Sequence, residues 1–259
     1  MRNIIKSDFY KFFKSKTFYV SLIVAILFAT LTVVATYFGL KQAGQPGGPP
    51  MGVISEDARA LFFNAISSNI IIMLVAVMTS IFIANEYSTG IIKDTVSSGK
   101  GRTKIFISKL IITGFASLLI TLAFAVYQLL FGLLFLEYSV VFNGAELWLL
   151  VSTFLSAAVV ILAFNTLFAM ITTAFKTLGA SLATNVGIIM FGGLLFYLVS
   201  LISDWLSNIS DYWLSDNLTA VVTNALAGTY EFKPLIIALC YTAVCVTVGI
   251  LTFRKQDIK

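Results

Sequence analysis

Histidine is absent from this sequence, cysteine occurs twice, and only 11% of the 259 residues are charged. Without histidine the chain lacks the usual general base, the usual metal ligand and the side chain that titrates near neutral pH. Hydrolytic triads and His-ligated metal sites are therefore disfavoured, and we predict neither a catalytic residue nor a metal site. Cys240 and Cys245 lie in the same apolar stretch. On a helix they point about 140° apart, so we expect no disulfide between them.

Apolar residues make up 59% of the chain, and the mean hydropathy is +0.96. Six charge-free stretches each reach the roughly 20 residues that a helix needs to cross a hydrocarbon core of about 30 Å. They run over residues 17–40, 60–84, 110–136, 147–175, 177–203 and 234–253. The sequence thus predicts an all-α integral membrane protein in which residues 1–259 form a single six-span transmembrane domain. No room is left for a soluble nucleotide-binding or nucleic-acid-binding domain.

Positive charge is divided unevenly between the two sides of the predicted spans. With the N-terminus in the cytoplasm, six spans return the C-terminus there as well. The inner segments then hold 14 of the 17 cations and 4 of the 12 acids, a net charge of +10, whereas the outer segments net −5. This asymmetry is typical of the positive-inside rule. It explains the basic pI of about 9.1, so we predict no nucleic-acid partner.

The N-terminal segment, residues 1–16, has a helical pattern of its own. Ile5, Phe9, Phe12 and Phe13 recur at helical spacing among lysines, which predicts an amphipathic helix lying in the inner membrane interface. The alternative is a basic flank that only sets the topology.

Two outer segments also contain local signals. Ser55 is followed by two acids, which predicts that it caps the second helix outside the bilayer. In the extracellular segment 203–233, Trp205, Ile209 and Trp213 fall four residues apart. This spacing predicts short outer helices that form an aromatic belt at the interface.

Polar and small residues inside the predicted spans are the other candidates for function. No span has a central charge, which disfavours ion-coupled pumping. The uncharged polar candidates are Asn69, Gln128, Asn165 and Asn185. Such side chains either hydrogen-bond between helices or line a substrate path. Gly179, Ala183 and Gly187 have the spacing that allows close helix approach, within one chain or at a subunit interface.

The longest predicted inner connection covers residues 85–109. Ile91, Ile92 and Val96 give a short helix one apolar side, and the glycines after it predict a turn before the next span. A surface helix held between two spans can transmit motion, whereas an ordinary solvated loop is the alternative. The Gly99-Lys100 pair lacks the other residues of a phosphate-binding loop. If transport here uses ATP, the ATPase is therefore a separate chain.

This connection reads Glu86-x-x-x-Gly90-x-x-Lys93, then a turn, then Arg102 and, seven residues on, Lys109. The pattern resembles the ABC-2 type permease family, especially bacitracin and lantibiotic export or immunity permeases. The resemblance implies an ATPase-coupling helix between the second and third spans. The coupling residues that it implies are Glu86, Tyr87, Gly90, Ile91, Lys93, Arg102, Lys104 and Lys109.

The same resemblance implies partners and a function. Two six-span subunits, identical or different, would pair through their first and fifth spans, which favours the interface role for Gly179, Ala183 and Gly187. Each subunit would dock on a cytoplasmic ABC ATPase subunit that binds ATP and Mg. The expected setting is the lipid of a bacterial plasma membrane. The expected function is export of a peptide antibiotic or lipid-like amphipath.

Two readings of another class stay open. One is an immunity or sensor scaffold that binds a toxin without transporting it. The other is a membrane-embedded substrate-capture subunit, although the few polar residues in the spans disfavour the deep polar pocket it would need. An intramembrane enzyme is disfavoured by the missing histidine.

Overall fold

The described part of the chain is helical throughout. The computed structural model describes residues 2–43, 57–136, 138, 142–202 and 209–256, and every regular element within these ranges is a helix. The helices are α1 (Arg2–Lys14), α2 (Lys16–Ala43), α3 (Ala58–Ser67), α4 (Asn69–Ser88), α5 (Ile91–Ser97), α6 (Arg102–Gly132), α7 (Gly144–Phe175), α8 (Leu178–Ser200), the 3₁₀ helix η3 (Ile209–Tyr212), α9 (Leu214–Leu226) and α10 (Lys233–Lys255).

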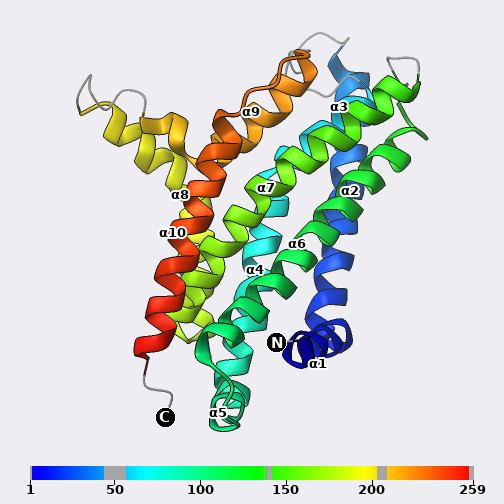
Figure 1. Cartoon of the computed structure of the whole chain (residues 1–259). Coiled ribbons are helices and arrows are strands. Elements are labelled where there is room, and N and C mark those ends of the chain that lie inside the picture. The colour runs from blue at the N-terminus through cyan, green and yellow to red at the C-terminus, as the bar shows by residue number, and fades with distance from the viewer. Residues whose placement is uncertain (1, 44–56, 137, 139–141, 203–208, 257–259) are drawn as a thin grey trace.

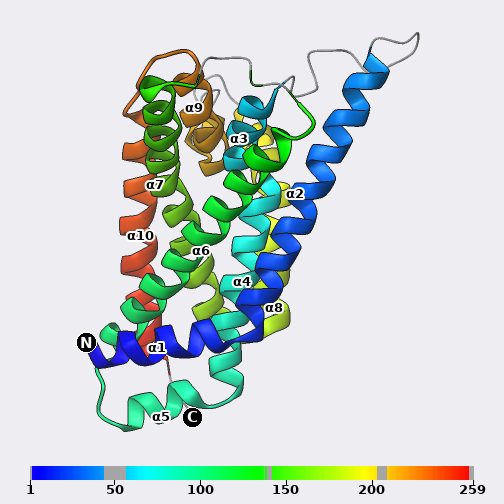
Figure 2. The same ribbon diagram turned by 90° about the vertical axis from the view of Figure 1, so that its right-hand side faces the viewer.

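Six of these helices are long and apolar enough to cross a membrane: α2, α4, α6, α7, α8 and α10. The predicted number of spans is thereby confirmed. Helices α1 and α5 and the C-terminal end of α10 lie at one end of the bundle, which we call the inner end (Figure 1). In Figure 2, α1 runs across this end, transverse to the spanning helices. The opposite, outer end carries α3 and α9.

Helices α4, α6 and α7 form the centre of the bundle, because each packs against the other two. The main core joins their apolar faces to parts of α2, α3 and α9. Helix α8 contributes little to it: 11% of its most apolar window is buried, against 61% for α4. One face of the molecule therefore leaves a spanning helix largely uncovered.

The second apolar stretch is not one continuous helix. Ser68 has an extended backbone between α3 and α4, and its hydroxyl caps the new helix by accepting from the Ile70 amide. The start of α3 is capped by Asp57, whose carboxylate accepts from the Ala60 amide. The predicted cap Ser55 lies outside the described residues. The prediction of one unbroken helix from residue 60 to 84 is wrong, because serine side chains can replace backbone bonds at such a break.

The outer segment before α10 packs onto the bundle. Helix α9 contacts α7, α3 and α10, and Trp213 at its start is buried against Phe164 and Phe196. A side chain at Gly192 would overlap the Trp213 ring. The prediction that Trp213 belongs to an interfacial aromatic belt is wrong, since the glycine opens a buried place for it. Trp205 lies outside the described residues.

Candidate functional site

The candidate site is the bracket that joins α4 to α6 at the inner end. Helix α4 continues to Ser88, and Gly90 then takes the left-handed backbone conformation (φ +74°) that turns the chain into α5. Gly99 repeats this conformation (φ +78°) after α5, and α6 begins at Arg102. Glycine adopts such angles without the steric cost that other residues meet. The connection itself therefore covers residues 89–101, shorter than the predicted 85–109, because both spanning helices extend into that segment.

An apolar cluster fixes α5 to the rest of the inner end. Ile92 of α5 is buried against Ile105 and Phe106 of α6 and Phe253 of α10. Gly249 makes this contact possible, because a side chain there would overlap the Phe106 ring. The short helix is thus packed on two spanning helices.

Hydrogen bonds join the same bracket to the end of α10. The Arg102 guanidinium donates from Nη1 to the carbonyls of Arg254 (2.6 Å) and Gln256 (2.9 Å). The Gln256 amide donates to the Thr173 carbonyl at 2.6 Å and accepts from the Tyr87 hydroxyl at 3.2 Å. These bonds satisfy carbonyls that every helix leaves free at its C-terminus. They connect α4, α6, α7 and α10 at a single point.

Next to the bracket lies a buried ionic triad of Asp8, Glu86 and Lys109. The Lys109 ammonium is 3.0 Å from Asp8 Oδ2 and 2.6 Å from Glu86 Oε2. All three side chains are more than nine-tenths buried. Ser108 also donates to Asp8 Oδ2, at 2.8 Å. Because a buried charge requires a partner, these contacts bind α1 to the ends of α4 and α6.

The remaining predicted coupling residues lie on the surface of the bracket. Ile91 is half-buried, and Lys93 and Lys104 are exposed. Other exposed residues around them are Ser88, Thr89, Asp94, Ser97, Ser98, Gly99, Lys100 and Gly101. The predicted set therefore divides into an exposed group and a group that holds the bracket together. The sequence prediction omitted Asp8, since one acid among lysines carries no signal for burial.

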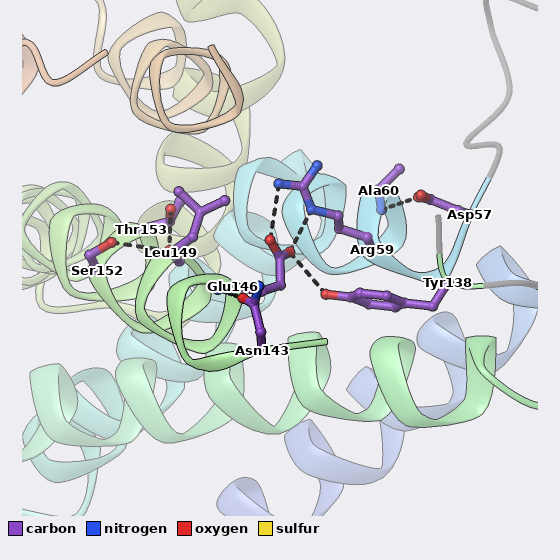
Figure 3. A network of polar contacts seen from close by, with 9 residues as sticks. All are labelled: Asp57, Arg59, Ala60, Tyr138, Asn143, Glu146, Leu149, Ser152 and Thr153. Atoms are coloured by element: carbon purple, nitrogen blue, oxygen red, sulfur yellow. Dashed lines mark hydrogen bonds and ion pairs between the residues drawn. The ribbon is translucent and has the colours of Figure 1, made fainter. Parts of the chain in front are cut away.

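A second ionic network lies at the outer end (Figure 3). Arg59 of α3 donates from Nε to Glu146 Oε1 of α7 at 2.6 Å, and its Nη2 reaches Oε2 at 3.4 Å. The Tyr138 hydroxyl donates to Glu146 Oε1 at 2.9 Å. Burial and the neighbouring Glu146 carboxylate raise the pKa of Tyr138 to about 12. The hydroxyl therefore stays protonated and keeps donating beyond the pH at which an ordinary tyrosine ionises. Asn143 caps α7 by accepting from the Glu146 amide at 2.9 Å.

All four polar candidates of the spans make hydrogen bonds to other helices. Asn165 accepts from Thr79 at 3.1 Å, and Gln128 donates to Thr32 at 2.7 Å. Asn185 donates to Ser80 at 2.8 Å and to Thr172 at 3.1 Å. Asn69 accepts from Ser215 at 2.9 Å. These contacts favour a packing role over a substrate-lining role.

The small residues of α8 lie on its uncovered surface. Gly179 and Ala183 are exposed and Gly187 is half-buried. A side-chain carbon added at either glycine would meet no atom of this chain within 4 Å. Within the described residues, these positions therefore serve no close packing inside the chain, in contrast to Gly192.

The six apolar helices agree with the result of comparison with known families. The model of a family described as ABC-2 family transporter protein matches residues 58–252. The match covers most of the chain, from α3 to near the end of α10, and the chain belongs to this family. It is a multi-pass membrane protein and a transporter permease subunit, a class that works with a partner ATPase subunit. No curated protein matches it.

Proposed function

We propose that the chain is the transmembrane subunit of an ATP-driven exporter and that α5 docks on a separate ATPase. The observation that carries the proposal is the division of the bracket into two faces. Ile92 and Arg102 fix it to α6 and α10, whereas Lys93 and Lys104 point away from the bundle's core and stay exposed. A surface that is exposed and rigidly attached suits the transmission of force from a partner.

The bracket connects such a force to the two central helices. Helix α5 follows α4 and precedes α6 in the chain. Helices α4 and α6 both pack against α7. A displacement of α5 therefore moves helices of the core rather than a loop. With two such subunits, nucleotide-driven closure of the ATPases would switch the assembly between inward-open and outward-open states. The free energy comes from the different affinity of nucleotide for the two states.

The substrate class that we propose is a cationic peptide antibiotic or a lipid-like amphipath. The outer segments carry a net charge of −5 by sequence, which raises the local concentration of cations. An apolar groove with a volume of about 540 Å³ lies between α7, α8 and α10, and its lining residues include Phe191, Trp213 and Tyr241. Acidic outer segments together with an apolar groove suit a molecule that has a cationic part and an apolar part.

Docking is tested by exchanging exposed charges of the bracket. The double variant Lys93→Glu/Lys104→Glu should abolish recovery of the ATPase with the tagged chain in mild detergent. The matched control is Arg254→Glu/Lys255→Glu, which reverses two exposed charges at the same end outside α5. The control should recover the ATPase as the unaltered chain does. Equal recovery by both variants would overturn docking through α5.

Transport is tested with the recovered complex. In a complex reconstituted with the unaltered chain, the ATPase should hydrolyse ATP faster when a cationic amphipathic peptide is present at the outer face. The charge-reversed bracket variant should lose this stimulation. ATP turnover that no amphipath changes, with binding intact, would replace the exporter proposal with the scaffold reading.

A further inference from the structure

Helix α1 has one face against the bundle and one face free. Asp8 and Phe12 are buried, and Phe12 packs on Phe82 of α4 and Phe18 of α2. On the opposite side, Tyr10 is 63% exposed, whereas Phe13 (36% exposed) lies at the edge of this face, against Phe18 and Phe115. The free face therefore holds one aromatic side chain that the chain itself does not cover.

The charge of the free face is of one sign. Lys6, Lys11 and Lys14 are exposed, and the Lys14 ammonium lies 4.6 Å from the centre of the Tyr10 ring. Asp8 is the one acid among residues 1–16, and its carboxylate is buried on the bundle side, 3.0 Å from the Lys109 ammonium. The lysines of this face thus have no acid of their own helix to pair with.

The position of α1 brings these cations to the level of lipid headgroups. Helix α1 crosses the inner end of the bundle while α2 rises from its C-terminus (Figure 2). A helix at that level with lysines and an exposed tyrosine on its free face is placed to contact the headgroup region, where the ring can insert and the lysines can meet phosphates. Each lysine near an anionic membrane surface strengthens binding about fivefold.

The buried face of α1 leads to the bracket. Asp8 is bound to Lys109, and Lys109 is bound to Glu86. Glu86 belongs to the last turn of α4, immediately before Gly90 and α5. A shift of α1 therefore changes the contacts of Lys109. Through Glu86, it also changes the position of the end of α4, from which α5 continues. Two sites that bias the same element influence each other reciprocally.

We propose that the free face of α1 binds anionic membrane lipid and that Asp8 transmits this binding to α5 through Lys109 and Glu86. The ligand chemistry is the phosphate of a lipid with net negative charge, held by Lys6, Lys11 and Lys14. The lipid site needs neither nucleotide nor a transported substrate. Only the consequence for the ATPase rests on the proposed function.

Site-specific reporters on the isolated chain test both parts. The two native cysteines are replaced by Cys240→Ser and Cys245→Ala, and one reporter cysteine is added at exposed Ser7 on α1 or exposed Ser97 on α5. Each protein is reconstituted in phosphatidylcholine nanodiscs with or without phosphatidylglycerol. A water-soluble maleimide measures the accessibility of the Ser7→Cys reporter, and a spin label measures the mobility of the Ser97→Cys reporter.

Phosphatidylglycerol should slow modification of the Ser7→Cys reporter at least severalfold and change the mobility of the Ser97→Cys label. The triple variant Lys6→Gln/Lys11→Gln/Lys14→Gln should weaken lipid binding about a hundredfold, so both responses should disappear. Asp8→Asn should keep the first response and lose the second. Ser108→Ala, which removes one hydrogen bond to Asp8, should weaken the second response without unpairing Lys109.

Arg254→Gln/Lys255→Gln is the matched control, because it removes two exposed cations at the inner end outside α1. It should keep both responses. If the triple variant behaves like this control, lipid recognition by α1 is overturned. If Asp8→Asn leaves the α5 response intact, the transmission is overturned. If the Ser7→Cys reporter ignores lipid but becomes protected when the ATPase is added, the free face docks a protein instead. None of these readouts depends on transport, so they fail or succeed separately from the proposed function.

Discussion

The inner and outer ionic networks fasten opposite ends of the bundle with different chemistry. At the inner end, one ammonium, Lys109, lies between carboxylates of two other helices, Asp8 and Glu86. At the outer end, the guanidinium of Arg59 meets the single carboxylate of Glu146. Each network attaches a helix that does not span, α1 or α3, to spanning helices.

The difference bears on which end of the bundle can rearrange more readily. A lysine ammonium is a compact charge on a flexible stem and can pass from one carboxylate to the other, whereas the arginine fork holds both oxygens of one carboxylate in a fixed plane. The inner network adjoins the bracket, and the outer one closes a corner of α3 and α7. We therefore expect the inner end to rearrange and the outer end to stay in place.

The largest effect is expected from Lys109→Met. It leaves Asp8 and Glu86 buried without a cation, which destabilises a protein by about 3–5 kcal/mol. Thermal unfolding in detergent measures this loss. The control is Lys104→Met, an exposed lysine on the same helix, which should change stability by less than about 0.5 kcal/mol. Equal stability of the two variants would contradict the burial of the triad.

The outer network should respond less strongly. In Glu146→Gln the side chain keeps its size but loses its charge, and Arg59, whose side chain is 20% exposed, regains part of its hydration. We expect a loss of about 1–3 kcal/mol. Glu231→Gln, an exposed outer acid, is the matched control. If Glu146→Gln costs more than Lys109→Met, the ranking of the two ends is reversed.

Two glycine substitutions compare packing near the bracket with packing on α8. Gly249→Ala forces its new carbon into the Phe106 ring, and overpacking of this kind costs about 1–3 kcal/mol. Gly187→Ala meets open space in this chain, so the isolated subunit should keep its stability. Denaturation midpoints of both variants test the contrast. A destabilised Gly187→Ala subunit, measured as a monomer, would show packing there that the structure lacks.

The smallest effect concerns Tyr138 and pH. Tyr138→Phe removes one hydrogen bond to Glu146 and should cost about 0.5–1.5 kcal/mol. The pKa of Tyr138 rises from 10.0 to about 12 on folding, so its contribution is complete below pH 10 and is lost as the pH rises through 12. The difference in stability between Tyr138→Phe and the unaltered chain should therefore be constant below pH 10 and shrink between pH 10 and 12. A difference that stays constant across pH 10 to 12 would contradict the raised pKa.

The sequence predicted the spans well because length and apolar composition determine them. It also predicted α1 and α5, whose helical spacing is visible in Phe9, Phe12, Ile91 and Ile92. It missed the break at Ser68, because the stretch is free of charge and was taken as one span, although Ser67-Ser68-Asn69 are polar residues of the kind that cap helices. The sequence prediction placed Asp57 in the first turn of the second helix, whereas in the structure Asp57 is the N-cap of α3.

The triad could not be predicted, because its members are joined by tertiary packing. Glu86 and Lys109 were selected by their place in a motif, with no indication that they touch. Asp8 is separated from Ser108, its hydrogen-bond partner, by 100 residues, a distance that no local periodicity reports. Arg59 and Glu146 are likewise too far apart in the sequence for local periodicity to pair them. The sequence analysis included them only in the net charge of the outer segments.

The positions of these partners along the chain also order events in time. Lys109 is the last member of the inner triad to be synthesised, whereas the outer pair is complete only with Glu146. During synthesis, the inner triad has all its members once residue 109 has left the ribosome, while the outer pair must wait for α7. The chain should therefore assemble vectorially, with a first half that closes its inner corner before the second half enters the membrane. In a nascent chain stalled between α6 and α7, the Lys109 side chain should already be protected from a water-soluble amine reagent. The Arg59 side chain should still be accessible to solvent.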